Sequence, residues 1–137
     1  MISFTIPGEP KALKRHRHTR KGFTYDPSKR DKKEMWLQIA RFKPKTPFKG
    51  EIYLRVAFYF KRPNHHFKIK KGKPSNIIKD KYAHIKYKSS RPDIDNLIKM
   101  IADVIQPQMI HEDDQICMLQ AEKLYGKPRT EVIIQEI

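Results

Sequence analysis

The chain has 137 residues, of which 38% are hydrophobic and 33% charged; this suits one folded domain and excludes a disordered chain. No apolar run is long enough to cross a membrane, and the N-terminus lacks the basic and apolar regions of a signal peptide, so we expect a cytoplasmic protein. The single cysteine, Cys117, excludes an internal disulfide and a thiolate metal cage, and we expect it to be buried.

The net charge of +15 is unevenly distributed along the chain. Residues 1–92 contain 26 of the 30 Lys and Arg but only six acids, a balance of +20, whereas residues 93–137 contain four bases and nine acids, a balance of −5. A positive field of this strength attracts a polyanion, most commonly DNA or RNA. An anionic membrane is the other candidate, but no basic stretch carries an apolar face for insertion. We therefore expect a nucleic-acid partner and no membrane.

The first predicted element is a short strand over residues 2–6, where apolar and polar residues alternate before Pro7 and Gly8. Residues 11–21 follow with neither a helical nor a strand period. This segment is either a solvated loop or a set of phosphate contacts, and its concentrated charge favours the second. The bases concerned are Lys11, Lys14, Arg15, Arg17, Arg20 and Lys21.

A helix is predicted from Asp26-Pro27, an N-cap acceptor followed by proline, to about Phe42. Its apolar stripe consists of Met35, Trp36, Ile39, Ala40 and Phe42. Residues 51–60 then alternate between apolar and polar side chains, which predicts the clearest strand of the protein.

Residues 61–90 show no lasting period and contain ten Lys or Arg against one acid, Asp80. We interpret them as a basic flap that is mobile without nucleic acid. Its Phe67, Tyr82 and Tyr87 either stack on unpaired bases or serve packing. The bases expected to contact nucleic acid here and just beyond are Lys68, Lys70, Lys71, Lys73 and Arg91.

The last part of the chain predicts an amphipathic helix over residues 95–106 and strands over 115–124 and 129–137. The short connection over residues 125–128 predicts a hairpin between these strands. The resulting order is β-α-β-(basic flap)-α-β-β. It indicates one α+β domain over residues 1–137, with a small mixed sheet, packed helices and a flexible insertion at about 61–90.

Acidic residues gather around the start of the helix over residues 95–106. Asp93 and Asp95 can converge if Asp93 lies just outside the helix, and Asp113 or Asp114 could supply a third carboxylate. Carboxylate oxygens are the ligands of Mg²⁺, which promotes phosphodiester hydrolysis. Lys99, one turn beyond Asp95, could neutralise charge on the phosphate or position water.

A purely structural interpretation explains the same residues in another way. Asp93 could be a helix cap, Asp95 and Lys99 an ordinary i,i+4 ion pair, and Asp113-Asp114 a turn. Three observations favour catalysis: the excess positive charge, the gathering of acids in one third of the chain, and the absence of a Walker loop, zinc spacing or serine elbow.

The sequence Pro92-Asp93-Ile94-Asp95-Asn96-Leu97-Ile98-Lys99, followed by Asp103 and by Glu112-Asp113-Asp114-Gln115-Ile116, resembles the signature of the RusA family of Holliday junction resolvases. The resemblance is strongest over residues 91–124. The long insertion is similar to that of phage or prophage members. Where the cellular form has a basic residue before the first aspartate, this chain has Pro92, with Arg91 one position earlier.

The resemblance implies a homodimeric, Mg²⁺-dependent endonuclease that binds four-way DNA junctions and nicks two opposed strands, in DNA recombination and repair. It implies no small-molecule cofactor, and Mn²⁺ is expected to replace Mg²⁺. By position, Asp93, Asp95 and Asp114 match the metal-binding acids and Lys99 the catalytic lysine. Asp113 remains the alternative to Asp114, and Asp103 matches a family position of undetermined role. Two other interpretations remain open: a non-catalytic nucleic-acid-binding protein, and a related nuclease for other branched DNA.

Overall fold

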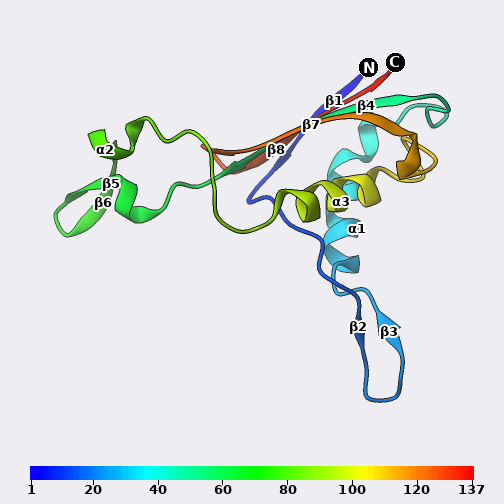
Figure 1. Ribbon diagram of the computed structural model, residues 1–137, viewed down its shortest axis with the longest axis horizontal. Helices are drawn as coiled ribbons and strands as arrows, with labels where there is room; N and C mark the ends of the chain where they lie inside the picture. Colours follow the sequence, from blue (N-terminus) through cyan, green and yellow to red (C-terminus); the bar gives the residue numbers. More distant parts are fainter.

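A computed structural model describes residues 1–137 and places four strands in one mixed sheet of order β1-β8-β4-β7 (Figure 1). The strands are β1 Ile2–Pro7, β4 Ile52–Phe60, β7 Ile116–Tyr125 and β8 Arg129–Glu136. Strand β8 is antiparallel to both β1 and β4, whereas β7 is parallel to β4. The predicted α+β class is confirmed.

Helices α1, Lys29–Ile39, and α3, Ile94–Ile105, pack against one face of this sheet (Figure 1). The predicted alternation of β4 is confirmed, since all its apolar positions of one parity are buried. They are Ile52, Leu54, Val56, Phe58 and Phe60. Helix α3 presents Leu97, Met100, Ile101, Val104 and Ile105 to the same core. Burying one such side chain stabilises the fold by about 1.5–3 kcal/mol, so this double layer holds the domain together.

The direction of α3 decides where its two ends lie. Because β4 and β7 are parallel, the chain must return across the sheet between them, and α3 makes part of this return. The helix therefore runs opposite to β7. Its first turn lies beside the middle of β7, and its last turn lies near the start of that strand (Figure 1).

The first helix begins later than predicted. Ser28 is the residue that precedes α1, and its side chain forms no cap. The carboxylate of Asp26 instead accepts hydrogen bonds from the Ser28 amide, at 2.9 Å, and from the Lys32 ammonium, at 2.7 Å. Asp26 thus accepts a hydrogen bond from a nearby amide, as an N-cap acceptor does, but the helix itself begins only at Lys29. The predicted end is close to the observed one, because a 3₁₀ turn at Ala40–Phe42 follows the helix.

The predicted hairpin between the last two strands is wrong, because β4 lies between β7 and β8. The connection passes over the end of β4, where the Gly126 amide donates to the Phe60 carbonyl at 2.9 Å. A Cβ at Gly126 would lie 3.0 Å from the Tyr59 ring, so a side chain at this position would crowd that ring. A short turn with glycine can therefore connect two strands that are separated by a third strand, as well as two strands that pair directly.

Two segments predicted without regular structure contain short elements. Within the first basic segment, β2 Arg17–His18 pairs with β3 Thr24–Tyr25. The insertion contains a 3₁₀ turn at Asn64–His66, the strands β5 Phe67–Lys70 and β6 Lys73–Ile78, and the short helix α2 Asp80–Ala83. Both project from the sheet (Figure 1). These strands form by local pairing within each hairpin. Their side chains are mostly exposed, so the sequence shows no alternation of apolar residues from which the strands could be predicted.

Cys117 is exposed, contrary to the expectation that it is buried. It lies near the start of β7, an outer strand of the sheet, where no other strand covers it. None of the helices has the length and apolar character needed to span a membrane.

Candidate active site at the start of helix α3

Asp93 immediately precedes α3 and has an extended backbone, with φ −70° and ψ 138°. The segment that leads to it is fixed to the sheet by Lys123 of β7. The ammonium of Lys123 donates hydrogen bonds to the carbonyls of Ser90, at 2.7 Å, and Pro92, at 2.8 Å. The position of Asp93 is therefore set by a strand as well as by the helix that it begins.

The side chains of Asp93, Asp95 and Lys99 are exposed and form no hydrogen bond or ion pair within the chain. Asp93 occupies the cap position but its carboxylate does not cap the helix. No ion pair joins Asp95 to Lys99, although their spacing would allow one. The structural roles that the sequence left open for these residues are therefore not observed, and the charges are free to act on a ligand.

The two acids border adjoining surface hollows. Asp93 shares one hollow with Arg91, Pro92 and Asn96. Asp95 and Lys99 border a groove between α3 and β7 whose apolar floor is formed by Ile94, Ile98, Leu119 and Ala121. Arg91 thus lies beside the first acid, where a base could meet a phosphate, even though Pro92 separates the two in sequence.

Asp113 and Asp114 lie at the other end of α3. They form a 3₁₀ turn, Asp113–Gln115, directly before β7. Gln115 holds this turn in place: its side-chain oxygen accepts from the amides of His111 and Glu112, and its amide nitrogen donates to the Phe48 and Gly50 carbonyls. The carboxylates of Asp113 and Asp114 are exposed and make no hydrogen bond or ion pair.

The four predicted site residues are therefore not all neighbours within one chain. Asp114 lies in the 3₁₀ turn before β7, and the strand then runs from Ile116 to Leu119, which lies beside Asp95, a further length of roughly 10 Å at about 3.3 Å per residue. No three carboxylate, imidazole or thiolate groups come close enough to hold a metal ion. One chain brings together Asp93, Asp95 and Lys99 and leaves Asp114 apart, so it does not assemble a three-carboxylate magnesium site by itself.

Asp103 serves the packing of α3 on α1. Its carboxylate lies 3.1 Å from the ammonium of Lys32, which also lies 2.7 Å from Asp26. Burial lowers the pKa of Lys32, but the hydrogen bonds to Asp26 and Asp103 outweigh it and raise the pKa overall. The hydrogen bond from Lys32 is also the main reason that the pKa of Asp26 is lowered. This network joins the two helices and does not face the free acids.

The first basic segment passes directly beside the start of α3. The Leu13 amide donates to the Asn96 carbonyl at 3.0 Å, and the Lys14 amide donates to the hydroxyl of Ser28 at 2.9 Å. Beyond this point the β2–β3 hairpin extends away from the body (Figure 1). Lys11 differs from the other predicted bases, since its ammonium lies 3.1 Å from Asp31 and 3.9 Å from Glu34. The remaining bases, which are exposed without an acidic partner, are Lys14, Arg15, Arg17, Arg20 and Lys21.

The basic residues of the insertion lie on a separate projection. Lys68, Lys70, Lys71 and Lys73 are exposed on the β5–β6 hairpin, which projects from the body in a different direction from the β2–β3 hairpin (Figure 1).

The insertion also has a small core, around His66, which is only 5% exposed. Its ring stacks on Tyr82 with centroids 4.3 Å apart and lies 3.3 Å from an Arg62 nitrogen. Burial, with the charge of His65 and Arg62 nearby, lowers the pKa of His66. Tyr82 is thus a packing residue, Phe67 is half-buried, and only Tyr87 of these three aromatics is exposed.

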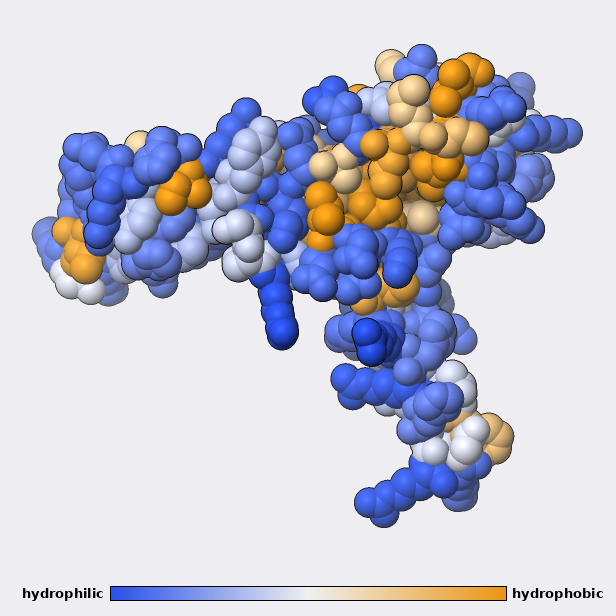
Figure 2. Space-filling view, viewed as in Figure 1, coloured by the Kyte–Doolittle hydropathy of each residue, from blue (hydrophilic) through white to orange (hydrophobic).

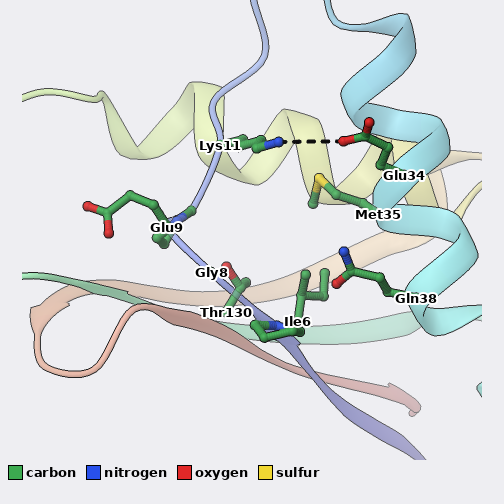
Figure 3. Close-up of a pocket in the computed structure, with 10 residues that line it drawn as sticks. Ile6, Gly8, Glu9, Lys11, Glu34, Met35, Gln38 and Thr130 are labelled. Atoms are coloured by element: carbon green, nitrogen blue, oxygen red, sulfur yellow. Dashed lines mark ion pairs between the residues drawn. The ribbon is translucent and has the colours of Figure 1, made fainter.

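Another hollow lies between the end of β1 and helix α1 (Figure 3). Lys11 points across it toward Glu34, whereas Glu9 points away (Figure 3). Apart from Glu9, which points away, its charged groups are Lys11 and Glu34, which pair with each other, so it does not gather free acids as the start of α3 does.

Sequence reasoning missed two features of this region: Lys123 as the anchor of residues 90–92, and the apolar groove beside Asp95. The groove had a signal in the sequence. Met118 and Leu119 are consecutive apolar residues in a strand, where strict alternation would place only one of them on the core face. Both are half-exposed, at 55% and 50%.

The sequence is similar to a known family of nucleases and to two known proteins. A family model described as "Endodeoxyribonuclease RusA" matches residues 7–135. The crossover junction endodeoxyribonuclease RusA of Lactococcus phage r1t is 32% identical over 104 residues, which cover 73% of this chain and 67% of that protein. YqaN, an uncharacterized protein of Bacillus subtilis (strain 168), is 30% identical over 145 residues, which cover 99% of this chain and 96% of that protein. The chain therefore belongs to the RusA family of endodeoxyribonucleases.

Proposed function

We propose that this protein is a Mg²⁺-dependent endonuclease that binds four-way DNA junctions and resolves them by paired symmetric nicks, in DNA recombination and repair. The observation that carries the proposal is the pair of free carboxylates, Asp93 and Asp95, beside Arg91 and the anchored basic segment. Acids left without partners in so basic a chain need a cation before they can approach a phosphate. Membership of the RusA family indicates hydrolysis of DNA, and we assign the active site to these residues.

The donor set agrees with magnesium in part. Mg²⁺ takes oxygen ligands, keeps several waters and is usually held by one or two carboxylates together with substrate phosphate, which Asp93 and Asp95 can provide. When bound, the ion would polarise the phosphoryl oxygen and stabilise the leaving oxygen. Lys99 is exposed on the same first two turns, and we assign to it the neutralisation of charge on the phosphate.

We assign the third carboxylate to a second copy of the chain. Asp114 lies roughly one helix length from Asp93 and Asp95 in its own chain, so it cannot join them there. In a two-fold dimer, each Asp114 can instead approach the α3 start of the partner. Two symmetric nicks also require two active sites related by a two-fold axis, which a homodimer provides. Asp113 is the neighbouring alternative for the same position.

The surface that fits such a dimer is the uncovered edge of β7. Residues 86–88 cover this edge only near its end, at Lys123–Tyr125. Figure 2 shows an apolar area over α3 and β7, where Ile94, Ile98, Leu119 and Ala121 line the groove. A free strand edge beside apolar surface invites pairing with another strand, and a soluble protein normally protects such an edge.

We infer that β7 pairs antiparallel with the partner's β7, in a register that carries each Asp114 toward the partner's α3. If the pairs are centred on Met118, Asp114 of the partner subunit lies opposite Glu122. Glu122 precedes Lys123, whose ammonium contacts the Pro92 carbonyl just before Asp93. The same dimer contact would thus bring Asp114 of the partner subunit to the part of β7 beside which α3 begins.

Cleavage of a panel of synthetic DNAs tests the proposed function. A four-way junction, a flap and a linear duplex of the same sequence are incubated with the protein in Mg²⁺, Mn²⁺ or EDTA. We expect paired nicks in the four-way junction with either metal and none in EDTA. Preferential cleavage of the flap would favour a nuclease for other branched DNA, and binding of all three without nicking would favour a non-catalytic binding protein.

A further inference from the structure

The hairpin formed by β2 and β3 ends in an exposed aromatic side chain that the proposed chemistry does not use. Phe23 is 67% exposed, and Tyr25 beside it is 47% exposed. The strands pair Arg17 with Tyr25 and His18 with Thr24, and the His18 ring lies 2.9 Å from the Thr24 hydroxyl. We call residues 14–25 the arm. The β2–β3 hairpin projects away from the body of the protein (Figure 1), and Phe23 immediately precedes β3.

The turn at the tip has a defined structure. The Thr19 amide donates to the Phe23 carbonyl at 2.7 Å, and the Thr19 hydroxyl accepts from the Phe23 amide at 3.1 Å. Gly22 has φ +82°, the left-handed region in which a side chain would be strained. A turn closed in this way holds Phe23 at the tip of the arm.

Folding does not explain why an aromatic residue stands at the tip. The ring of Phe23 contacts no other aromatic ring and no cation, and it contributes nothing to the core. Its neighbours in sequence include Arg20 and Lys21, which have no acidic partner. An apolar ring beside unpaired bases suits a ligand that combines a flat apolar face with negative charge.

The base of the arm is fixed relative to the acids. The Leu13 amide bonds to the Asn96 carbonyl of α3, and the Lys14 amide bonds to the fully buried hydroxyl of Ser28. The Ser28 amide in turn donates to Asp26, which is paired with Lys32. These contacts set the direction of the arm at its root, so a nucleic acid whose phosphate reaches the start of α3 also comes within reach of the arm.

We propose that the arm recognises unstacked bases of branched DNA, with Phe23 stacking on the free face of a base while Arg17 and Arg20 contact the flanking phosphates. The proposal rests on the proposed function, because it names the part of the DNA substrate that the protein reads. Bases inside a duplex are already stacked on each other, whereas a base at a crossover or in a single strand presents a free face. Phe23 therefore favours branched or single-stranded DNA over linear duplex.

Binding measurements without metal separate this role from cleavage. Dissociation constants of Phe23→Ala are measured in EDTA for a four-way junction, a single strand and a linear duplex. Loss of one stacked base weakens binding on the order of tenfold. We expect that loss for the junction and the single strand, no change for the duplex, and an unchanged dependence on salt, because no charge is removed. A loss for the junction alone would place the stacked base at the crossover.

Two further variants make the test specific. Phe23→Trp should restore binding and Phe23→Leu should not, because leucine is apolar but has no flat ring. Leu37→Ala is the matched control: Leu37 is equally exposed, at 67%, but lies on α1 away from the arm. Equal weakening on all three DNAs, full binding by Phe23→Leu, or no effect of Phe23→Ala on the junction would each overturn the proposal. If the wild type binds in this way but never nicks junctions, the proposed function fails and the stacking role stands.

Discussion

The amide of Leu13 donates a 3.0 Å hydrogen bond to the carbonyl of Asn96, one residue after Asp95. This bond joins the most basic segment of the chain to the start of α3, where the free acids lie. In the proposed complex, a DNA phosphate lies at Asp93 and the bases of the arm contact the phosphates on either side of it. The basic and acidic parts of the sequence are thus adjacent in the folded protein.

The dependence of DNA binding on salt should report the phosphates that the arm neutralises. Replacing Arg15, Arg17 and Arg20 with Gln should reduce the slope of log affinity against log salt by about 0.9 for each phosphate that is no longer neutralised. The measurement is a titration of a four-way junction over a range of salt concentrations. Bases outside the assigned set, Lys33, Arg41 and Lys43, serve as the control when changed in the same way. An unchanged slope for the arm variant would count against a role of these arginines at the phosphates.

Asp93→Asn should lower the nicking rate in Mg²⁺ by about a hundredfold or more, the usual scale for removing one electrostatic element of an active site. Junction binding should remain equal or become tighter, because a negative charge facing DNA is lost. Single-turnover cleavage and binding in EDTA measure the two effects separately. Asp103→Asn is the matched control on the same helix, since its carboxylate is paired with Lys32. Nicking at the wild-type rate by Asp93→Asn would remove this residue from the site.

Lys32→Met should destabilise the fold by about 1–2 kcal/mol, because Asp26 and Asp103 would then lack the ammonium with which both are paired. Thermal unfolding measures the change in stability, with Lys33→Met, an exposed lysine without a partner, as the control.

The effect of pH on this variant follows from the pKa shifts. The pKa of Asp26 is lowered, so its contribution is present above the ordinary value of 3.8 and is lost as pH falls through the lower folded value. The pKa of Lys32 is raised, so its contribution is present below 10.5 and is lost as pH rises through the higher folded value. The difference between wild type and variant should therefore be constant near neutral pH and shrink at both extremes. A difference that changes between about pH 6 and 8 would contradict this account.

Local patterns in the sequence predicted the core elements well. The alternation of β4 and the spacing of Leu97, Ile101 and Val104 on α3 reflect burial on one face, which leaves a periodic trace. The position of β8 between β1 and β4 left no such trace, because strand order depends on contacts between distant parts of the chain. The start of α1 was placed too early, since Pro27 and Ser28 form a turn before the helix begins at Lys29.

The candidate site was predictable in composition but not in assembly. The spacing of Asp93, Asp95 and Lys99 within one helical turn or two placed them together, and the structure does so. Asp114 could be named from its motif, but its distance from these residues depends on the direction of α3 relative to β7, which one sequence does not reveal. The exposure of Cys117 and Leu119 could not be predicted either, because the sequence does not reveal that β7 lies at the edge of the sheet.

Leu119→Asp should separate the proposed dimer. A charge at the centre of an apolar interface has no partner and costs several kcal/mol, which raises the dissociation constant at least about a hundredfold. Light scattering at micromolar concentration should then show a monomer that binds DNA but no longer nicks junctions. Leu37→Asp, at a position as exposed on α1, should leave both mass and nicking unchanged. A wild type that is already monomeric when active would refute the β7 interface.

Mixing two inactive variants should restore activity if Asp114 acts across the dimer. In a heterodimer of Asp93→Asn and Asp114→Asn, one site carries both changes and the other carries neither. With random exchange, about a quarter of all sites would then be intact, and each active dimer would make a single nick instead of a pair. Mixing Asp93→Asn with Asp95→Asn is the control, because both changes fall in the same half of the site and no arrangement restores it. If Asp114 instead completed the site of its own chain, neither mixture would cleave, because every heterodimer would then contain two damaged sites.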